Sequence, residues 1–222
     1  MLKIVVFDGG YGGEFLADKL EEELPVVDII RVIDWRNADS ILRSPRRARK
    51  IAEKALAPYI GRADLIIFGN YLISLTSLGY FQNKYSHQKF IGLQLKQSDS
   101  FIPRDTLILS TNAVTHTPKF LGYVLRTQHR VRTLSVDSWP HDIDEGTLSQ
   151  EDIRATIEDF LAKKKFRPEQ IILTCSQFDD IKDDLTAIFG HKVKIYDGFE
   201  DTIRSTFKAL GIRGGLGKKR KK

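Results

Sequence analysis

Short apolar runs alternate with helical patterns along this chain, and this alternation constrains the fold more than any other feature. The runs predict strands at residues 3–7, 27–33, 64–68, 89–93, 106–109, 131–136, 171–173 and 192–196. Helices are predicted between them at 14–23, 45–59, 72–82, 119–127, 149–163, 181–188 and 200–210. Ser44 and Ser149 are expected to cap two of these helices. Apolar runs of this length are typical of strands that helices cover on both faces. The pattern therefore predicts an α/β protein with doubly wound parallel sheets.

Two pairs of predicted strands also resemble one another. Residues 3–8 match 106–111 at an offset of 103, and residues 65–70 match 171–176 at an offset of 106. This repetition predicts two similar halves, and it pairs Gly69 in the first half with Cys175 in the second. The polar stretches 94–104 and 138–146 lack a clear period. We interpret the first as a connection between the halves and the second as a loop.

Composition excludes several classes of protein. A chain of 222 residues with 41% hydrophobic residues suits two small domains or one large one. Its single cysteine excludes an intrachain disulfide and a cysteine-rich zinc site. No apolar run approaches the roughly 18–20 residues of a membrane span, and the first residues lack the features of a signal peptide. We therefore expect a cytoplasmic protein that does not contact membranes.

The net charge of +6 comes mostly from the C-terminal end, where residues 218–222 are all Lys or Arg. The rest of the chain is close to neutral, so we expect no nucleic-acid partner beyond nonspecific contacts of this basic, disordered tail. The five histidines lack the spacing of metal ligands. The acidic residues Asp142, Asp144 and Glu145 are interpreted as a solvated loop, so no metal site is expected.

The single thiol lies at a predicted strand end, in Thr174-Cys175-Ser176. Ligands bind at the carboxyl ends of strands in open α/β sheets, so Cys175 is a candidate catalyst. A lone cysteine is, however, more often a small buried apolar residue. The glycine-rich stretch 9–13 likewise has two interpretations. It is either a tight strand-to-helix turn or a helix N-terminus that binds a carboxylate or phosphate.

Several motifs resemble those of glutamate racemases. Residues 8–13, DGGYGG, are similar to the DSGVGG opening of that family. Gly69-Asn70-Tyr71 stands where the family has Cys-Asn-Thr, and Cys175-Ser176-Gln177 where it has Cys-Thr-His. Weaker similarities lie at 34–37, 110–120, 144–146 and 196–200. Because the matches follow one order over nearly the whole chain, the chain resembles the aspartate/glutamate racemase superfamily and glutamate racemase in particular.

This resemblance implies two pseudo-symmetric α/β domains, at 1–95 with 198–217 and at 105–197, with the site in the cleft between them. It implies an isomerase that uses no cofactor, in which one cysteine thiolate removes the Cα proton and a facing thiol returns one. The ligand would be a small carboxylate or amino acid. The protein would supply a peptidoglycan precursor and would form a homodimer. The implied catalytic residues are Cys175 and Asp8, and the implied substrate contacts are Gly9, Gly10, Asn70, Tyr71, Thr111, Ser176 and Gln177.

The departures from the family pattern leave three functions open. Gly69 replaces the first cysteine, and glycine cannot transfer a proton. Tyr71 is a poor substitute base because its phenol has an ordinary pKa near ~10. Gln177 replaces the histidine that would assist Cys175. The chain is therefore interpreted as a single-cysteine isomerase, as a one-cysteine decarboxylase or isomerase of a dicarboxylate, or as an inactive relative that binds a ligand or partner.

Overall fold

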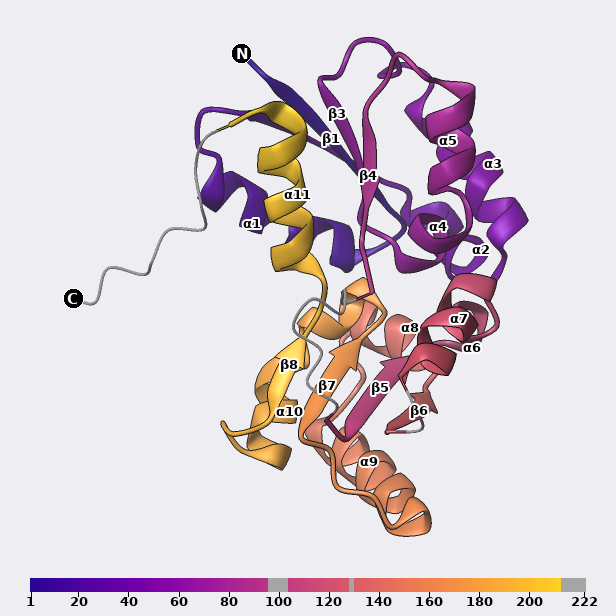
Figure 1. Ribbon diagram of the computed structural model, residues 1–222, viewed down its shortest axis with the longest axis vertical. Coiled ribbons are helices and arrows are strands. Elements are labelled where there is room, and N and C mark those ends of the chain that lie inside the picture. The colour runs from indigo at the N-terminus through magenta and orange to yellow at the C-terminus, as the bar shows by residue number, and fades with distance from the viewer. Residues whose placement is uncertain (96–103, 128–129, 213–222) are drawn as a thin grey trace, which may run out of the picture. The chain divides into compact units, whose positions relative to one another are not determined.

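The computed structural model describes residues 1–95, 104–127 and 130–212. The chain forms two compact units, one of Met1–Gln94 with the residues from Gly198 onward, the other of Leu95–Asp197. Each unit has a four-stranded parallel sheet flanked by helices (Figure 1). The predicted α/β fold with parallel sheets is thereby confirmed.

The first unit has the strand order β2-β1-β3-β4. Its elements are β1 (Lys3–Asp8), α1 (Tyr11–Glu23), β2 (Asp28–Ile33), η1 (Trp35–Asn37), α2 (Ala38–Arg43), α3 (Pro45–Leu56), β3 (Leu65–Phe68), α4 (Tyr71–Thr76), α5 (Leu78–Lys84), β4 (Phe90–Gly92) and α11 (Phe199–Leu210). The last helix, α11, comes from the end of the described chain yet contacts β3 and β4 (yellow in Figure 1).

The central strands of the first sheet, β1 and β3, are buried on both faces, as their continuous apolar runs predict. Alternate strand residues such as Val5, Phe7 and Phe68 join one core with Ala52 of α3 and Phe81 of α5. The helix α1 packs on β1 and β2, and Lys19 of α1 lies over the ring of Phe199 in α11. Because successive strand side chains point to opposite faces, one run of apolar residues supplies both halves of this core.

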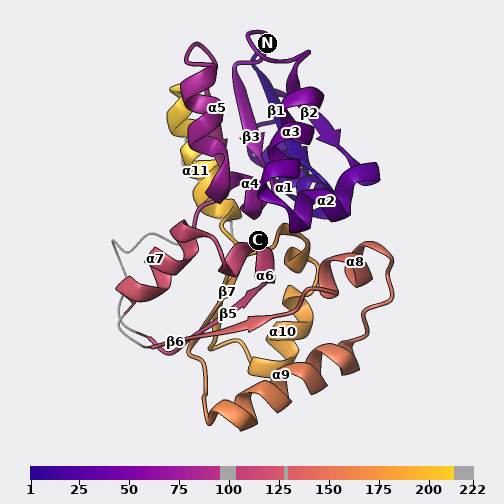
Figure 2. The same ribbon diagram turned by 90° about the vertical axis from the view of Figure 1, so that its right-hand side faces the viewer.

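The second unit repeats this arrangement with the order β6-β5-β7-β8. Its elements are β5 (Thr106–Ser110), α6 (Asn112–Thr115), α7 (Pro118–Arg126), β6 (Val131–Ser135), α8 (Trp139–Asp144), α9 (Gln150–Lys164), β7 (Gln170–Leu173), η3 (Ser176–Asp179), α10 (Lys182–Phe189) and β8 (Lys194–Tyr196). The helices α9 and α10 contact each other (Figure 2).

The predicted internal repeat matches the right strands, but it aligns their residues one position out of register. β1 and β5 occupy the same place in their sheets, as do β3 and β7. The backbone N–H of Gly69 donates to the carbonyl of Phe7, however, and its counterpart is the N–H of Thr174, which donates to Leu109. Hydrogen bonding therefore matches Gly69 with Thr174, the residue before Cys175.

Several sequence expectations for helices differ from the structure. The stretch 138–146 is not a loop: it contains α8, whose Trp139 and Ile143 are both buried one helical turn apart. The predicted helix 72–82 is two helices, α4 and α5, which meet at Ser77. Hydroxyl groups in α4 bond back to the backbone four residues earlier, which competes with a continuous helix.

The short helices α2 and α6 were not predicted, because six and four residues are too few to show a helical period. Both predicted serine caps are confirmed, since Ser44 accepts from the N–H of Arg47 and Ser149 from that of Asp152. Most of the connection 94–104 and the basic tail 218–222 lie outside the described residues. No helix in the described ranges is long and apolar enough to cross a membrane.

Candidate functional site

Asp8 is the last residue of β1, in the middle of the first sheet, and its side chain is completely buried. One carboxylate oxygen, Oδ1, accepts hydrogen bonds from the backbone N–H of Gly9 at 2.6 Å and from Nδ2 of Asn70 at 3.3 Å. Asn70 caps α4 at the same time, because its Oδ1 accepts from the N–H of Ile73 at 3.2 Å. The two predicted site residues Asp8 and Asn70 are thus fixed together at neighbouring strand ends.

The glycine-rich stretch after β1 is a very short turn. α1 begins at Tyr11, so only Gly9 and Gly10 lie between strand and helix. Gly10 occupies the N-cap position of α1 and has no side chain to cap it. A Cβ on residue 9 would lie 3.1 Å from Cδ1 of Ile41, so the glycine here allows α2 to pack closely. Backbone N–H groups at the start of a helix are suited to binding an anion.

Gly69 lies beside Asp8 and leaves little room for a side chain. A Cβ on residue 69 would lie 3.3 Å from Oδ2 of Asp8 and 3.3 Å from the Cα of Gly13. A side chain at this position would therefore touch the carboxylate of Asp8 directly.

Tyr71 is buried at the start of α4, and its hydroxyl is directed to the end of the first unit. The hydroxyl donates to the carbonyl of Gln94 at 3.3 Å, and a Cβ on Gly198 would collide with it. Gln94 is the last residue before the chain leaves the first unit, and Gly198 is the first after it returns. In this structure, the phenol of Tyr71 fills the space beside both connecting segments.

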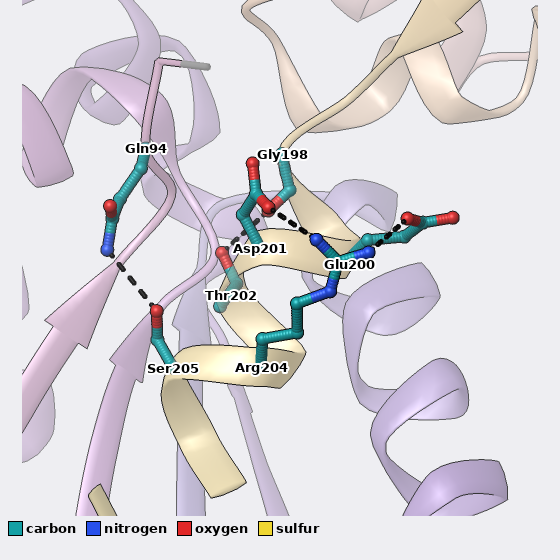
Figure 3. Close-up of polar contacts among 7 residues, drawn as sticks. All are labelled: Gln94, Gly198, Glu200, Asp201, Thr202, Arg204 and Ser205. Atoms are coloured by element: carbon teal, nitrogen blue, oxygen red, sulfur yellow. Dashed lines mark hydrogen bonds and ion pairs between the residues drawn. The ribbon is translucent and has the colours of Figure 1, made fainter. Parts of the chain in front are cut away.

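Figure 3 shows how the start of α11 is held at this place. Nε2 of Gln94 reaches Oγ of Ser205 at 3.5 Å, and the hydroxyl of Thr202 donates to the carbonyl of Gly198 at 2.8 Å. Arg204 points away from Gln94 and pairs with Glu200 and Asp201 of its own helix. The bond between Gln94 and Ser205 therefore ties α11 to the segment after β4, while Arg204 bonds within the helix.

In the second unit, Cys175 lies two residues past β7, at the cap position before η3, and is 5% exposed. Its thiol donates a hydrogen bond to Oε1 of Gln177, with 3.0 Å between the heavy atoms. The preceding residue, Thr174, bonds to Ser110 at the end of β5 through the two hydroxyl groups, 2.7 Å apart. The predicted position of the thiol at a strand end is confirmed.

Hydrogen bonds through Gln177 connect Cys175 with α8. Gln177 is completely buried, and its Nε2 donates to Oδ2 of Asp144, the last residue of α8, at 3.4 Å. Ser176 donates its hydroxyl to Oε1 of Gln177 at 3.3 Å. Thr111 is buried at the cap position of α6, and its side chain makes no capping bond there.

An ion-pair cluster fixes the segment after Cys175. Lys182 pairs with Asp179 at the end of η3 and with Asp197 just after β8. Desolvation lowers the pKa of Lys182, but the charge of Asp197 and hydrogen bonds to both carboxylates outweigh it, so the pKa is raised overall. Burial raises the pKa of Asp180, and the negative charges of Asp179 and Asp184 add to that effect.

Sequence reasoning did not find the role of Lys182 or the contact between Gln177 and Asp144. The spacing of Asp179 and Lys182 could have suggested one ion pair, because such residues share a helix face. The other partners are distant in sequence and meet only through packing. The residues described by the structure contain no group of three or more His, Cys, Asp or Glu side chains that could hold a metal ion.

Comparison with known proteins identifies similar chains. No protein-family model matches. The chain is 24% identical over 211 residues to a glutamate racemase from Clostridium perfringens. The alignment covers 92% of this chain and 81% of that protein. These values show similarity in sequence over nearly the full length.

Solved structures give the same result for the fold. A glutamate racemase from Campylobacter jejuni superposes with a TM-score of 0.80 at 21% identity, covering 100% of this chain and 89% of the other. A glutamate racemase from Francisella tularensis, solved in complex with D-glutamate, gives 0.76 at 19% identity, with 99% and 84% covered. The chain thus has a glutamate racemase-like fold.

Proposed function

We propose that this protein is a racemase-like isomerase that transfers a proton at the Cα of a small amino or carboxylic acid without a cofactor, using Cys175 as its single thiol. The observation that carries the proposal is the position of Cys175 at a strand end in a fold similar to that of glutamate racemases. The similarity in sequence over 92% of the chain supports it further.

The proposed ligand is a small amino acid such as glutamate or aspartate. The relative from Francisella tularensis was solved with D-glutamate, which supports a ligand of this class. Asp8 and Cys175 are the proposed catalytic groups. The proposed ligand contacts are Gly9, Gly10, Asn70, Tyr71, Thr111, Ser176 and Gln177. Among them, the uncapped start of α1 at Gly10 suits a carboxylate, because its N–H groups carry partial positive charge.

Gly69 favours a second candidate, a one-cysteine decarboxylase or isomerase of a dicarboxylate. Such an enzyme forms a carbanion and protonates it from one side, so it needs only one thiol. The third candidate is an inactive relative that binds a ligand. Tyr71 favours it, because its phenol is buried among residues of its own unit and is bonded to Gln94.

Solvent deuterium exchange at Cα separates these functions. The protein is incubated in heavy water with glutamate, aspartate and small malonates, and exchange and inversion are followed by NMR and chiral chromatography. We expect Cα exchange that falls by a factor of roughly 10²–10⁴ in Cys175→Ser and in Asp8→Asn. The folded state of each variant is checked by circular dichroism.

Each other outcome selects one alternative. Exchange without inversion indicates a base on one face only, and release of carbon dioxide from a malonate indicates the decarboxylase. In Gly69→Cys, a second thiol would stand next to Asp8, and inversion gained by this variant would support the racemase ancestry of the site. If neither the wild type nor Gly69→Cys exchanges any of these acids, the isomerase proposal is wrong and the binding protein remains.

A further inference from the structure

The amide of Gln177 lies between a thiol and a carboxylate. Sγ of Cys175 is 3.0 Å from Oε1, and Oδ2 of Asp144 is 3.4 Å from Nε2. The hydroxyl of Ser176 also donates to Oε1. Gln177 is completely buried and Cys175 nearly so, so water does not readily replace these partners.

Asp144 decides which end of this amide faces the thiol. An ionised carboxylate only accepts hydrogen bonds, and the NH₂ group of glutamine only donates them. The NH₂ group of Gln177 therefore faces Asp144, and the amide oxygen faces Cys175 and Ser176. Rotating the amide by half a turn would place its oxygen against the carboxylate and lose both contacts.

The orientation of the amide in turn acts on the protonation of Cys175. The amide oxygen is a pure acceptor, so the bond to Cys175 exists only while the sulfur carries its proton. A thiolate would stand against the lone pairs of Oε1. A hydrogen bond donated by the neutral form disfavours ionisation, and burial of the thiol acts in the same direction.

From these contacts we propose that Gln177 and Asp144 are positioning residues that hold Cys175 as a neutral thiol, so that it enters the reaction as a proton donor. This rests on the proposed function, in which the other catalytic group, the carboxylate of Asp8, takes the Cα proton. The electron pair of the broken C–H bond stays on the carbon as a carbanion. As that carbon is protonated, the S–H bond breaks, a C–H bond forms and sulfur takes the negative charge. The thiolate then regains its proton from solvent water.

The other charged groups on the surrounding elements agree with this. Asp144 at the end of α8 carries negative charge, which disfavours a thiolate. The positive charge of Lys182 is shared between Asp179 and Asp197.

Titration of the thiol tests the inference without any substrate. The chain has one cysteine and seven tyrosines, so the difference in ultraviolet absorbance between the wild type and Cys175→Ser reports the thiolate of Cys175 alone. For the wild type we expect half-ionisation above the ordinary value for cysteine, about 8.5. In Asp144→Asn the amide of Gln177 is free to turn and donate to the thiolate. In Gln177→His the ring offers a donor. In both variants we expect the pH of half-ionisation to fall by at least about one unit. At a pH below both midpoints, each variant then contains about ten times more thiolate than the wild type.

Asp142→Asn is the matched control, since it removes the same charge from the same helix without touching Gln177 in any described side-chain contact. The inference is overturned if the wild-type thiol ionises at or below the ordinary value, or if Asp142→Asn has the same effect as Asp144→Asn. If Gln177→His does not fold, Asp144→Asn tests the inference alone. Asp144 lies at the partly exposed end of α8, so we expect this variant to fold. Absence of Cα exchange would refute the proposed function and leave the titration result unaffected.

Discussion

Gly13 and Asp8 approach so closely that a Cβ on residue 13 would lie 2.5 Å from the Cβ of Asp8 and 2.7 Å from Cδ1 of Ile33. The third residue of α1 must therefore be glycine for the helix to pack on the ends of β1 and β2. This requirement, rather than the flexibility of a loop, accounts for Gly13 in the glycine-rich stretch.

Gly13→Ala should destabilise the protein by roughly 1–3 kcal/mol, because the added methyl group overpacks a buried contact. It should also lower the activity of the proposed site more than other substitutions of equal cost, since Asp8 must shift. Gly79→Ala is the matched control near the start of another helix, where nothing lies within 4 Å. That variant should be stabilised by roughly 0.5–1 kcal/mol, because alanine favours helices. Urea unfolding measures both, and equal effects would refute the packing argument.

Gly198→Ala should lower the stability of the protein by more than backbone strain alone accounts for. Gly198 has φ of +78°, where an alanine costs roughly 1–2 kcal/mol, and its Cβ would collide with the hydroxyl of Tyr71. Gly211 has a similar backbone, with φ of +68°, and a Cβ added there would have no neighbour within 4 Å. Gly211→Ala should therefore lose stability through backbone strain only. We expect the midpoint of thermal unfolding to fall further in Gly198→Ala. Adding Tyr71→Phe should recover part of the difference, and no recovery would contradict the placement of Tyr71.

Lys182→Met should lower the free energy of unfolding by roughly 3 kcal/mol, because it leaves the nearly buried carboxylates of Asp179 and Asp197 without their cation. Lys163→Met is the control, since its pair with Asp159 is exposed and should be worth less than about 1 kcal/mol.

The effect of Lys182→Met should also depend on pH. Because folding raises the pKa of Lys182, its contribution to stability is complete at pH values below its ordinary pKa of 10.5. That contribution is lost as the pH rises through the higher pKa of the folded state. In the variant, protonation relieves the unpaired carboxylates, so the deficit relative to wild type should shrink as the pH falls toward about 4. Urea unfolding across this range measures it. A deficit independent of pH would show that the lysine contributes by packing alone.

Tyr123→Phe should leave stability unchanged or raise it by up to about 1 kcal/mol at neutral pH, because the buried hydroxyl has no hydrogen-bond partner among the described residues. Burial also raises the pKa of Tyr123 to about 12. In the unfolded chain a tyrosine ionises near ~10, so the wild type should lose stability between about 10 and 12 while the variant loses less.

Denaturant unfolding at neutral and alkaline pH measures the effect of Tyr123→Phe. Tyr85→Phe is the control at neutral pH, since the hydroxyl of Tyr85 donates to Glu53 at 2.9 Å and its removal should destabilise by about 1 kcal/mol. A destabilised Tyr123→Phe would mean that its hydroxyl has a partner in solution.

Local patterns predicted the elements but not every boundary. Apolar runs located the strands, and Ser44 and Ser149 marked two helix starts, because burial and capping depend on residues close in sequence. The helix α8 was missed because its acidic residues suggested a solvated loop. Its stability comes from burial of Trp139 and Ile143, which depends on what they pack against.

The sequence by itself determined an α/β chain with repeated strand ends, a single thiol at one of them and glycine beside the carboxylate at another. Only the tertiary structure decided which side chains meet there. Asn70 bonds to Asp8 across 62 positions of sequence, and Gln177 bonds to Asp144 across 33. Such contacts depend on how strands pair and helices pack, and one residue of register changes them. For that reason, the thiol could be located from sequence, whereas the amide that faces it and the carboxylate behind that amide could not.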